Sequence, residues 1–361
     1  MRILFLACLG KNKGGNAFGG AEKSIVNLAN WLADKDYDVV LVSVEGDAKA
    51  YDISDKVKYE GKEIIKKNKL YTHYQLYANT RHMIKKYKPD IIISFFLHPL
   101  FYALPSIITK KIKAIYSERN DPDREYGKAA KLMRKILVKH IDGIVFQTKD
   151  ARNYFPDKIK KKSIVIHNPT YVKYDDYAIV ENPDKRIVTV GRLNPQKNHK
   201  LLIKAFSEIS DKYKDYTLEI YGEGPLRNDL ESLIRELGME NKIILKGTYK
   251  DVLNRIYGSS LFVMTSVYEG MPNALIEAMC LGIPVICSDC PCGGPRELIE
   301  NGKNGYLFKP DDIEQLKKYM SQLLDKYNID MCLREKEICK THSKEKIFAD
   351  WEEYISNIVK Q

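Results

Sequence analysis

The chain has 361 residues, of which 44% are hydrophobic and 30% charged, a mixture typical of globular proteins. This length exceeds what one ordinary core accommodates, and it predicts two domains of roughly 150 to 200 residues each. No apolar run approaches the roughly 18 to 20 residues that a membrane-spanning helix needs, so the composition excludes an integral membrane protein.

The net charge of +11 is unevenly placed, because residues 1–180 hold 33 Lys and Arg against 20 Asp and Glu. A basic first half attracts nucleic acid, an anionic membrane or an anionic substrate alike, and charge alone does not choose between them. Seven cysteines follow no disulfide framework, and the apolar start MRILFLACLG is predicted to be a first strand rather than an export signal. We therefore expect free thiols and a cytoplasmic location.

The first half alternates β-branched apolar runs with amphipathic stretches, the pattern of a parallel sheet covered by helices. Strands are predicted at Arg2–Cys8, Val39–Val44, Asp90–Phe95, Ile112–Tyr116, Gly143–Phe146 and Ile164–Ile166. A Gly-rich segment at 10–22 joins the first strand to a helix and has the composition of a phosphate-binding loop, with a flexible surface loop as the alternative. It has neither the GxGxxG spacing of a dinucleotide site nor the Gly-Lys-Ser/Thr ending of a P-loop.

The second half repeats the alternation. Its strands are predicted at Arg186–Val190, Leu218–Tyr221, Ile243–Leu245, Leu261–Met264 and Pro284–Cys287. The segment 168–184 contains two Asn-Pro breaks and is predicted to be a linker. The fold class is thus α/β, with two Rossmann-like doubly wound domains at 1–167 and 185–342. A C-terminal helix at 343–361 carries Trp351 and Tyr354 on its apolar face and is expected to cross back to the first domain.

Two carboxylates bracket a predicted strand-to-helix turn in the segment Glu269-Gly-Met-Pro-Asn-Ala-Leu-Ile-Glu277. Pro272 fits a first helical position, where its missing N–H costs nothing, so a helix N-terminus suited to a diphosphate is predicted here. The free amides that open this helix are predicted to be those of Asn273, Ala274 and Leu275. A pair of solvated acids beside an ordinary helix start is the alternative.

A loop from Gly191 to Asn198 follows the first strand of the second half. It places Arg192 and Lys197 at a strand end, where a guanidinium fork and a compact ammonium can both meet one diphosphate without a metal ion. Two solvated loop cations are the alternative. The Gly-Glu-Gly-Pro turn at 222–225 is predicted to lead into another helix, with Pro225 at its first position.

Together these segments resemble glycosyltransferase family 4, retaining enzymes with the GT-B fold of two Rossmann-like domains facing a cleft. The resemblance spans nearly the whole chain, and it includes the Gly-Gly-Ala-Glu loop at 19–22. It implies that Arg192 and Lys197 bind the diphosphate of a nucleotide-sugar, with Glu277 on the ribose and Glu269 on hydroxyls of the transferred sugar. The donor-binding positions that it implies further are Gly19, Gly20, Asn273, Ala274 and Leu275.

A finer resemblance is to the branch that builds capsular, exopolysaccharide and O-antigen repeat units. It is carried by the segments 117–122 and 289–297, and it makes Glu118 and Arg119 candidates for contact with the acceptor or the donor sugar. Many family members have a His-x-His-like pair at the end of the strand at 90–95, where this chain has Ser94 and Phe95. His98, three residues later, is a catalytic candidate, and a histidine facing solvent or a core edge is the alternative.

The resemblance implies that cations and helix amides meet the charge of the leaving diphosphate, so no metal and no cofactor besides the nucleotide-sugar is expected. Two Asp-x-Asp matches, at 36–38 and 121–123, are the carboxylate pairs that a metal test would examine. Four cysteines suggest a zinc site by number, but their spacing matches no paired zinc knuckle, and buried thiols are expected instead. They are Cys280, Cys287, Cys290 and Cys292.

The segment Lys128–Lys139 places Leu132, Met133, Ile136 and Leu137 on one helical face, with basic residues around it. It is interpreted as a core-packed helix with a basic outer face, and a helix lying on anionic lipid is the alternative. In either case the basic first domain is expected to attract the cytoplasmic membrane surface or a pyrophosphate-linked lipid.

The sequence therefore predicts a retaining, metal-independent glycosyltransferase that moves a hexose or N-acetylhexosamine from a nucleotide-sugar. UDP is the expected nucleotide, and a polyprenyl-pyrophosphate-linked glycan is the expected acceptor, at the cytoplasmic face of the membrane. A basic nucleic-acid-binding protein competes with this prediction, but the basic half has no recognisable binding module. An NAD-dependent oxidoreductase also competes, but neither half has the glycine fingerprint with an acidic ribose residue.

Overall fold

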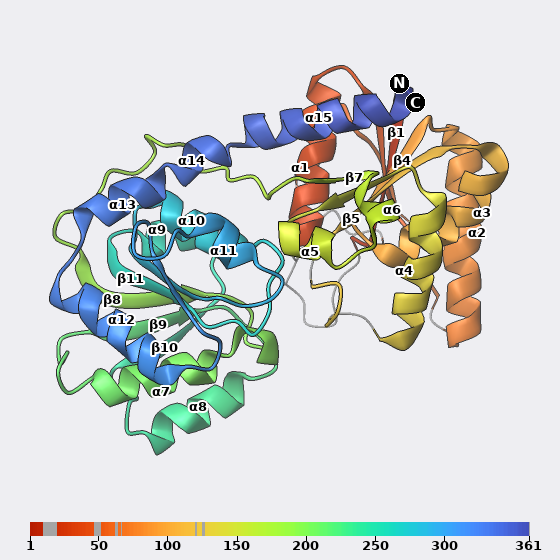
Figure 1. Cartoon of the computed structure of the whole chain (residues 1–361). Helices are drawn as coiled ribbons and strands as arrows, with labels where there is room; N and C mark the ends of the chain where they lie inside the picture. Colours follow the sequence, from red (N-terminus) through yellow and green to blue (C-terminus); the bar gives the residue numbers. More distant parts are fainter. Residues whose placement is uncertain are drawn as a thin grey trace. The chain divides into compact units, whose positions relative to one another are not determined.

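Figure 1 shows the computed structural model of the chain, which describes residues 1–9, 20–46, 52–61, 64–65, 67–119, 121–124 and 127–360. The chain forms two compact units. The first consists of Met1–Pro169 together with Glu345–Gln361, and the second consists of Thr170–Lys344. Each unit has its own parallel sheet and its own core, so each is described by itself.

The sheet of the first unit has the strand order β3-β2-β1-β4-β5-β6-β7, and its strand pairs are parallel. The strands are β1 (Arg2–Ala7), β2 (Asp38–Ser43), β3 (Lys58–Gly61), β4 (Ile91–Ser94), β5 (Lys113–Glu118), β6 (Gly143–Phe146) and β7 (Ser163–Val165). Its central strands are continuous buried apolar runs, as a parallel sheet with both faces covered requires. The chain order reverses on either side of β1, and ligands of such sheets bind outside the carboxyl ends of the strands at that point.

Helices cover both faces of this sheet. They are α1 (Gly20–Asp34), α2 (Lys69–Tyr87), α3 (Leu97–Lys110), α4 (Lys128–His140), α5 (Lys149–Asn153), α6 (Asp157–Lys160) and α15 (Lys344–Lys360). α1 and α15 share one core with alternate residues of β1, β2, β4, β5 and β6. α3 contacts β1, β4 and β5 and lies between α2 and α4 (Figure 1). In the chain, β4 follows α2 and α3 follows β4. The last turn of α2 therefore lies at the amino edge of the sheet, and the first turns of α2 and α3 both lie at the carboxyl edge.

The C-terminal helix α15 belongs to the first unit, as the sequence predicts. Trp351 stacks on Phe95 with ring centroids 5.3 Å apart, and Phe348 packs at a tilt against Trp31 at 5.8 Å. The hydroxyl of Tyr354 donates to the Lys162 carbonyl at 2.8 Å, which ties the helix to β7 and its neighbours. The seventeen residues of α15 thus complete a core that begins at Ile3 on β1.

The second unit has a parallel sheet with the order β10-β9-β8-β11-β12-β13. Its strands are β8 (Asp184–Val190), β9 (Thr217–Tyr221), β10 (Ile243–Gly247), β11 (Ser259–Met264), β12 (Val285–Ser288) and β13 (Tyr306–Phe308). Its helices are η1 (Pro195–Lys197), α7 (His199–Ile209), α8 (Arg227–Glu236), α9 (Val252–Ile256), α10 (Asn273–Cys280), α11 (Gly294–Leu298), α12 (Ile313–Asp325), α13 (Ile329–Lys336) and α14 (Ile338–Thr341). One core lies on each face, the first under α7, α8 and α12 and the second under α9, α10 and α14.

The segment 168–184, expected to be a linker, contains the passage from the first unit to the second, at Pro169 and Thr170. Most of the segment packs on the second unit. Val172 is buried in its core, and Ile179 lies so close to Gly282 that a Cβ atom there would approach it to 2.3 Å. The Nζ of Lys336 donates to the Tyr177 carbonyl, which fixes the segment to α13 as well.

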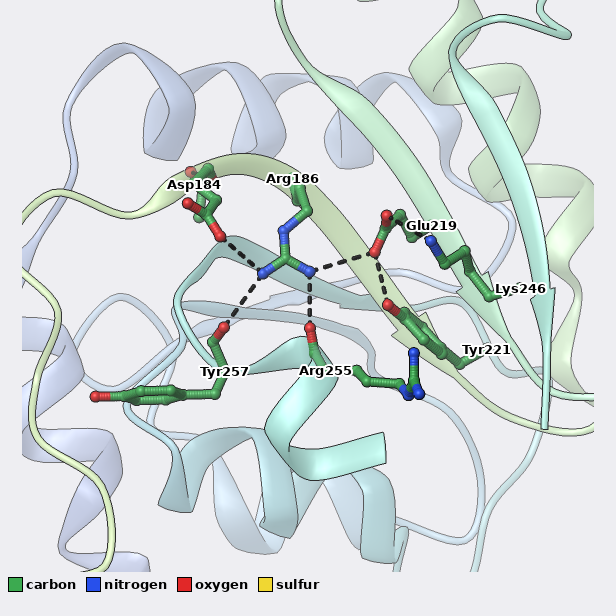
Figure 2. Close-up of polar contacts among 8 residues, drawn as sticks. Asp184, Arg186, Glu219, Tyr221, Lys246, Arg255 and Tyr257 are labelled. Carbon is green, nitrogen blue, oxygen red and sulfur yellow. Dashed lines mark hydrogen bonds and ion pairs between the residues drawn. The ribbon is translucent and has the colours of Figure 1, made fainter. Parts of the chain in front are cut away.

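Figure 2 shows the guanidinium of Arg186, on β8, between carboxylates and backbone carbonyls. Its partners are Asp184 at 2.9 Å, Glu219 at 3.3 Å, the Arg255 carbonyl at 2.7 Å and the Tyr257 carbonyl at 3.2 Å. Glu219 in turn accepts from the hydroxyl of Tyr221 at 2.7 Å and from Lys246 at 3.2 Å. This cluster joins β8, β9 and β10 to the turn after α9, and its charges are matched within it.

Candidate functional site

The loop after β8 carries both of the predicted diphosphate-binding cations. Arg192 is exposed, whereas Lys197 folds back over Gly191, where a Cβ atom would lie 3.3 Å from the lysine Cδ. The loop is fixed to the end of β11 because the hydroxyl of Thr265 donates to the carbonyls of Lys197 and Asn198, at 3.1 and 2.9 Å. The backbone that carries the two cations is therefore held in place at the carboxyl edge of the sheet.

Lys197 and Glu269 form an ion pair, with 2.5 Å between Nζ and Oε1. Their side chains are 18% and 9% exposed, so the pair is largely removed from solvent and its attraction is only weakly screened. The sequence predicts a role for each residue separately, and the structure brings the two together. A ligand that carries negative charge would therefore meet a lysine that Glu269 already orients.

The turn between β11 and α10 differs from its predicted form. Pro272 lies before the helix, in an extended conformation with φ −77° and ψ 106°, and α10 begins at Asn273. The Pro272 carbonyl accepts from the amides of Leu275 and Ile276, at 3.1 and 3.2 Å. The prediction that Leu275 offers a free amide is therefore wrong, because a tightened first turn uses it. Asn273 and Ala274 supply the first two amides of the helix.

Glu277 lies on α10, a little more than one turn after the helix begins, and it is half-buried. Glu269 lies in the preceding loop, where its backbone is bonded on both sides. Its amide donates to the Pro291 carbonyl at 2.6 Å, and its carbonyl accepts from the amide of Cys292 at 2.8 Å. The two acids thus have different settings, one on a helix and one on a loop held by the chain after β12.

Glycines let these loops approach one another. A Cβ atom on Gly222 would lie 1.9 Å from the Gly191 carbonyl oxygen, and one on Gly224 would lie 2.3 Å from that of Leu193. A Cβ on Gly294 would lie 1.8 Å from the Gly270 carbonyl oxygen. Side chains are excluded at such distances, so the glycines are needed for the packing of four loops at one edge. In the turn at 222–225, the sequence predicts Pro225 as the first residue of a helix. This prediction is wrong, because α8 begins at Arg227, two residues later.

His199 lies beneath the loop and has no role in the sequence-based prediction. It is the first residue of α7, it is buried, and neither ring nitrogen has a hydrogen bond of normal geometry from any described residue. Its ring is near the backbone of Gly191 and Arg192. Burial, with a smaller contribution from Lys197, lowers the pKa of His199 to about 4, so the imidazole is neutral at physiological pH.

Glu118 and Arg119, predicted to contact a sugar, lie at the end of β5 and in different surroundings. Glu118 is buried and pairs with Arg134 at 3.1 Å, the two side chains being 0% and 4% exposed. Arg134 also donates to the Pro122 carbonyl at 2.7 Å, so this pair fastens α4 to the strand end. Arg119 stacks its guanidinium 3.8 Å from the ring centroid of Phe95 and donates to Asn168 at 2.9 Å. Glu118 is thus buried in an ion pair with Arg134, a partner that the sequence does not reveal.

Three further predicted residues belong to the first unit. Gly20 is exposed as the first residue of α1, and Gly19 lies outside the described residues. His98 is exposed on the first turn of α3. Partial desolvation of the ring, with a smaller effect of the neighbouring His73, lowers the pKa of His98.

α4 exposes part of the apolar face that the sequence assigns to the core. Leu137 is fully buried, but Leu132 and Ile136 are 59% and 38% exposed. The helix turns Arg134 inward instead, because Glu118 offers it a buried partner. The interpretation of Leu132 and Ile136 as core residues is therefore wrong. Over the described residues, we find no helix with the length and apolar character that crossing a membrane requires.

The four cysteines considered for a zinc site are buried, as expected: Cys280 on α10, Cys287 on β12, and Cys290 and Cys292 in the loop that follows. Burial is the main cause that raises the pKa of the Cys290 thiol to about 12, so it stays protonated. Among the described residues, no group of three or more His, Cys, Asp or Glu is placed to hold a metal ion.

Comparison with known proteins identifies the class that this fold and site define. A model of group 1 glycosyl transferases matches residues 177–338, and a model of glycosyltransferase family 4 matches residues 18–173. The chain is therefore a glycosyltransferase, with the GT-B fold. The family 4 match falls almost entirely in the first unit and the group 1 match falls in the second, so both units match glycosyltransferase domains.

Relatives span the whole chain. A Haemophilus influenzae protein named as an uncharacterized glycosyltransferase is 26% identical, over 92% of this chain and 95% of its own. A Campylobacter jejuni alpha-1,4-N-acetyl-D-galactosaminyltransferase, whose name includes diNAcBac-PP-undecaprenol, is 24% identical over 94% of this chain and 96% of its own. The crystal structure of Anabaena HepE with UDP and glucose has the same fold, with a TM-score of 0.83 and 19% identity over 99% of this chain and 100% of HepE.

Proposed function

We propose that the chain transfers a hexose or N-acetylhexosamine from a UDP-sugar to a lipid-linked glycan in the synthesis of a cell-surface polysaccharide. The observation that carries the proposal is the ion pair of Lys197 with Glu269, which precedes α10 by a short turn, with Arg192 exposed on the same loop as Lys197. Two cations and helix amides at one strand edge suit a diphosphate. The complex of HepE with UDP supports uridine as the nucleoside of the donor, and the name of the Campylobacter relative supports a diphosphate-linked acceptor.

In the proposed reaction, the bond between the anomeric carbon and the diphosphate oxygen breaks. The oxygen of an acceptor hydroxyl bonds to that carbon on the same face, and its proton passes to the departing diphosphate. Arg192 and Lys197 stabilise the negative charge that develops there, without a metal ion, and each such donor is worth roughly 3 to 4 kcal/mol. Glu269 holds hydroxyls of the transferred sugar and Glu277 holds the ribose. Retention by front-face attack requires no protein nucleophile.

The exposed face of α4 supports an encounter with a membrane on its cytoplasmic side. Leu132 and Ile136 point outward, and Lys128, Lys135 and Lys139 are exposed on the same helix. Apolar residues among lysines suit the interface of an anionic bilayer, where the lysines neutralise lipid charge and the apolar groups enter the headgroup boundary. The protein is thus proposed to be a peripheral membrane enzyme, and the two alternatives of a nucleic-acid-binding protein and an oxidoreductase are set aside by its family.

The donor site is tested by thermal stabilisation in EDTA with a panel of nucleoside diphosphates and their sugars, because a ligand that binds the native state raises the melting temperature. We expect UDP or a UDP-sugar to stabilise the wild type, and the shift to disappear in Arg192→Ala and Lys197→Ala. Lys204→Ala removes an exposed lysine of α7 and is the matched control. No shift with any nucleotide, or a shift that appears only when magnesium is added, contradicts the proposal.

The membrane face is tested by flotation with vesicles that contain anionic or only zwitterionic lipid. We expect binding to the anionic vesicles alone, and its loss in the double variant Leu132→Ser, Ile136→Ser. Leu333→Ser, which removes a leucine of similar exposure (44%) from α13 of the second unit, is the matched control. Equal binding by the double variant and the control would show that α4 does not carry the contact.

A further inference from the structure

Gln196 links the loop that carries Lys197 to the loop that carries Glu269. Its carbonyl accepts from the amide of Val267 at 2.8 Å, and its side-chain amide donates to the carbonyl of Tyr268 at 2.9 Å. The next residue of each loop is a member of the ion pair, whose Nζ and Oε1 lie 2.5 Å apart. Three successive contacts therefore run in register from one loop to the other.

The backbone around Gln196 is fixed by its neighbours. Gln196 is the middle residue of η1, which begins at Pro195 with its restricted φ angle. The side chain of Asn194 accepts from the amide of Lys197 at 3.2 Å and caps this short helix. The hydroxyl of Thr265 donates to the Lys197 carbonyl at 3.1 Å, from the end of β11. The backbone of Lys197 is thus held by contacts that do not involve the side chain of Gln196.

Glu269 is held from a different direction. Its backbone is bonded to the loop after β12, which leaves its distance from Lys197 to be set by other contacts. The preceding residue supplies one of them, because the Tyr268 carbonyl accepts from the side chain of Gln196. Such a contact matters to a binding group, since a misplacement of about 1 Å can cost an enzyme roughly 10²-fold in rate.

We propose that Gln196 is a positioning residue for the transferred sugar. This inference rests on the proposed function, in which Lys197 binds the diphosphate and Glu269 binds hydroxyls of the sugar. By holding the Tyr268 carbonyl, Gln196 sets the distance between these two groups, so that it matches the span from the diphosphate to the sugar. Gln196 itself does not touch the donor.

The inference is tested by calorimetric titration of the full chain with UDP and with one UDP-sugar. This UDP-sugar is the member of a panel of UDP-hexoses and UDP-N-acetylhexosamines that stabilises the wild type most. Gln196→Met keeps the length of the side chain and removes its N–H donor. We expect it to weaken binding of the UDP-sugar by roughly three- to tenfold, the effect of one hydrogen bond, and to leave binding of UDP within about twofold. UDP is spared because the backbone contacts of Lys197 remain.

A second substitution separates the hydrogen bond from the bulk of the side chain. Gln196→His offers an imidazole N–H near the place of the glutamine Nε2, and it is expected to restore part of the affinity for the UDP-sugar. Gln322→Met is the matched control, because it removes an amide that donates to the Tyr306 hydroxyl at 2.5 Å elsewhere in the second unit. Melting temperatures without ligand verify that the variants fold.

A double variant shows whether Gln196 acts through Glu269. Glu269→Gln removes the carboxylate that is proposed to bind the sugar. Adding Gln196→Met to it is therefore expected to change the affinity for the UDP-sugar by less than about twofold, because the two residues act in one chain of contacts. A full and independent loss in the double variant would show that Gln196 acts elsewhere, and it would overturn the inference.

The outcomes distinguish the inference from the function on which it rests. If the wild type binds the UDP-sugar and Gln196→Met binds it equally well, the inference is overturned and the proposed function stands. If Gln196→Met weakens UDP and the UDP-sugar by the same factor, the residue supports the loop as a whole, and the inference is again overturned. If the wild type binds neither ligand, the proposed function itself fails.

Discussion

At the scale of single residues, the ion pair of Lys197 with Glu269 joins the residue proposed to bind the diphosphate to the residue proposed to bind the transferred sugar. We expect Lys197→Ala to lower kcat/KM by roughly 10²- to 10³-fold, because the developing charge on the diphosphate loses a preorganised donor. Glu269→Gln is expected to lower it as well, and the double variant to lose less than the product of the two effects, as residues in contact do. Initial rates over a range of donor concentrations measure this. Fully independent effects would show that the pair does not act as a unit.

His199 makes a second prediction at this scale, about acid stability. The imidazole of His199 binds a proton near pH 6.5 in the unfolded chain and only near pH 4 in the folded chain. The stability that the neutral ring contributes is therefore complete above pH 6.5 and is lost as the pH falls toward 4. The loss amounts to roughly 3 kcal/mol for a difference of this size. His199→Leu is expected to equal or exceed wild-type stability at neutral pH and to lose less in acid. Urea midpoints measured at neutral and at acid pH check this, and parallel losses in both proteins would contradict it.

Residue chemistry was predictable where position along the chain determines it. Arg192, Lys197 and Glu269 follow strands, so their place at the carboxyl edge comes from the alternation of elements alone. Their pairing does not, because nothing in the sequence indicates a contact between a lysine and a glutamate that are 72 positions apart. Glu118 shows the converse. Its partner Arg134 belongs to a helix whose lysines suggest an outward face, and only the packed structure turns that arginine inward.

At the scale of elements, the contact of α13 with β12 contains a buried acid. Glu335 accepts from the amide of Val285 at 3.0 Å, and its second oxygen has no hydrogen-bond partner among the described residues. Burial raises the pKa of Glu335 well above its ordinary value. The carboxyl is therefore protonated in the folded chain at pH values where the unfolded chain has lost the proton.

The sign of the pH effect follows from this difference. Stability from the protonated acid is complete below the unfolded pKa and falls by up to about 1.4 kcal/mol per pH unit above it, until the folded pKa is reached. Glu335→Gln keeps the acceptor for Val285 and removes the titration. We expect it to melt near the wild-type temperature at acid pH and above it at alkaline pH. A difference between the two proteins that stays constant with pH would contradict the prediction.

The limits of sequence-based prediction also differ among elements. Buried strands such as β4 and β12 were predictable, because their apolar runs are continuous. The edge strands β3 and β13 were missed, because the sequence of β3 (Lys58–Gly61) is largely polar and β13 (Tyr306–Phe308) has only three residues. Both prolines predicted to open helices lie before them, because a proline is also compatible with the extended or turn residues that precede a helix.

At the scale of the whole molecule, α15 provides the last part of the first unit's core. Trp351 is 2% exposed, and it stacks on Phe95, whose ring also lies under the guanidinium of Arg119. Trp351→Ala is expected to destabilise the first unit by about 3 to 5 kcal/mol, the range for large aromatic residues truncated in a core. Trp31, whose ring packs at a tilt against Phe348 of α15, remains as an intrinsic fluorescence probe.

Fluorescence of Trp31 reports this loss directly, because the chain has two tryptophans and both belong to the first unit. We expect its unfolding midpoint to move to lower urea in Trp351→Ala. Nucleotide protection of the second unit is expected to remain, since residues 170–344 do not include the helix. A midpoint that does not move would show that α15 is not needed for the stability of the core.

The return of α15 means that the first unit is discontinuous along the gene, whereas the second is one uninterrupted insertion within it. A fragment that ends at residue 169 would contain every strand of the first sheet but would lack α15, which completes its core. Cutting the chain at the predicted linker would therefore give an incomplete first unit. A circular permutant that begins at Thr170 and continues from the old C-terminus into Met1 would make each unit contiguous. It would join them by one peptide connection instead of two, which offers a direct means of measuring what the second connection contributes to turnover.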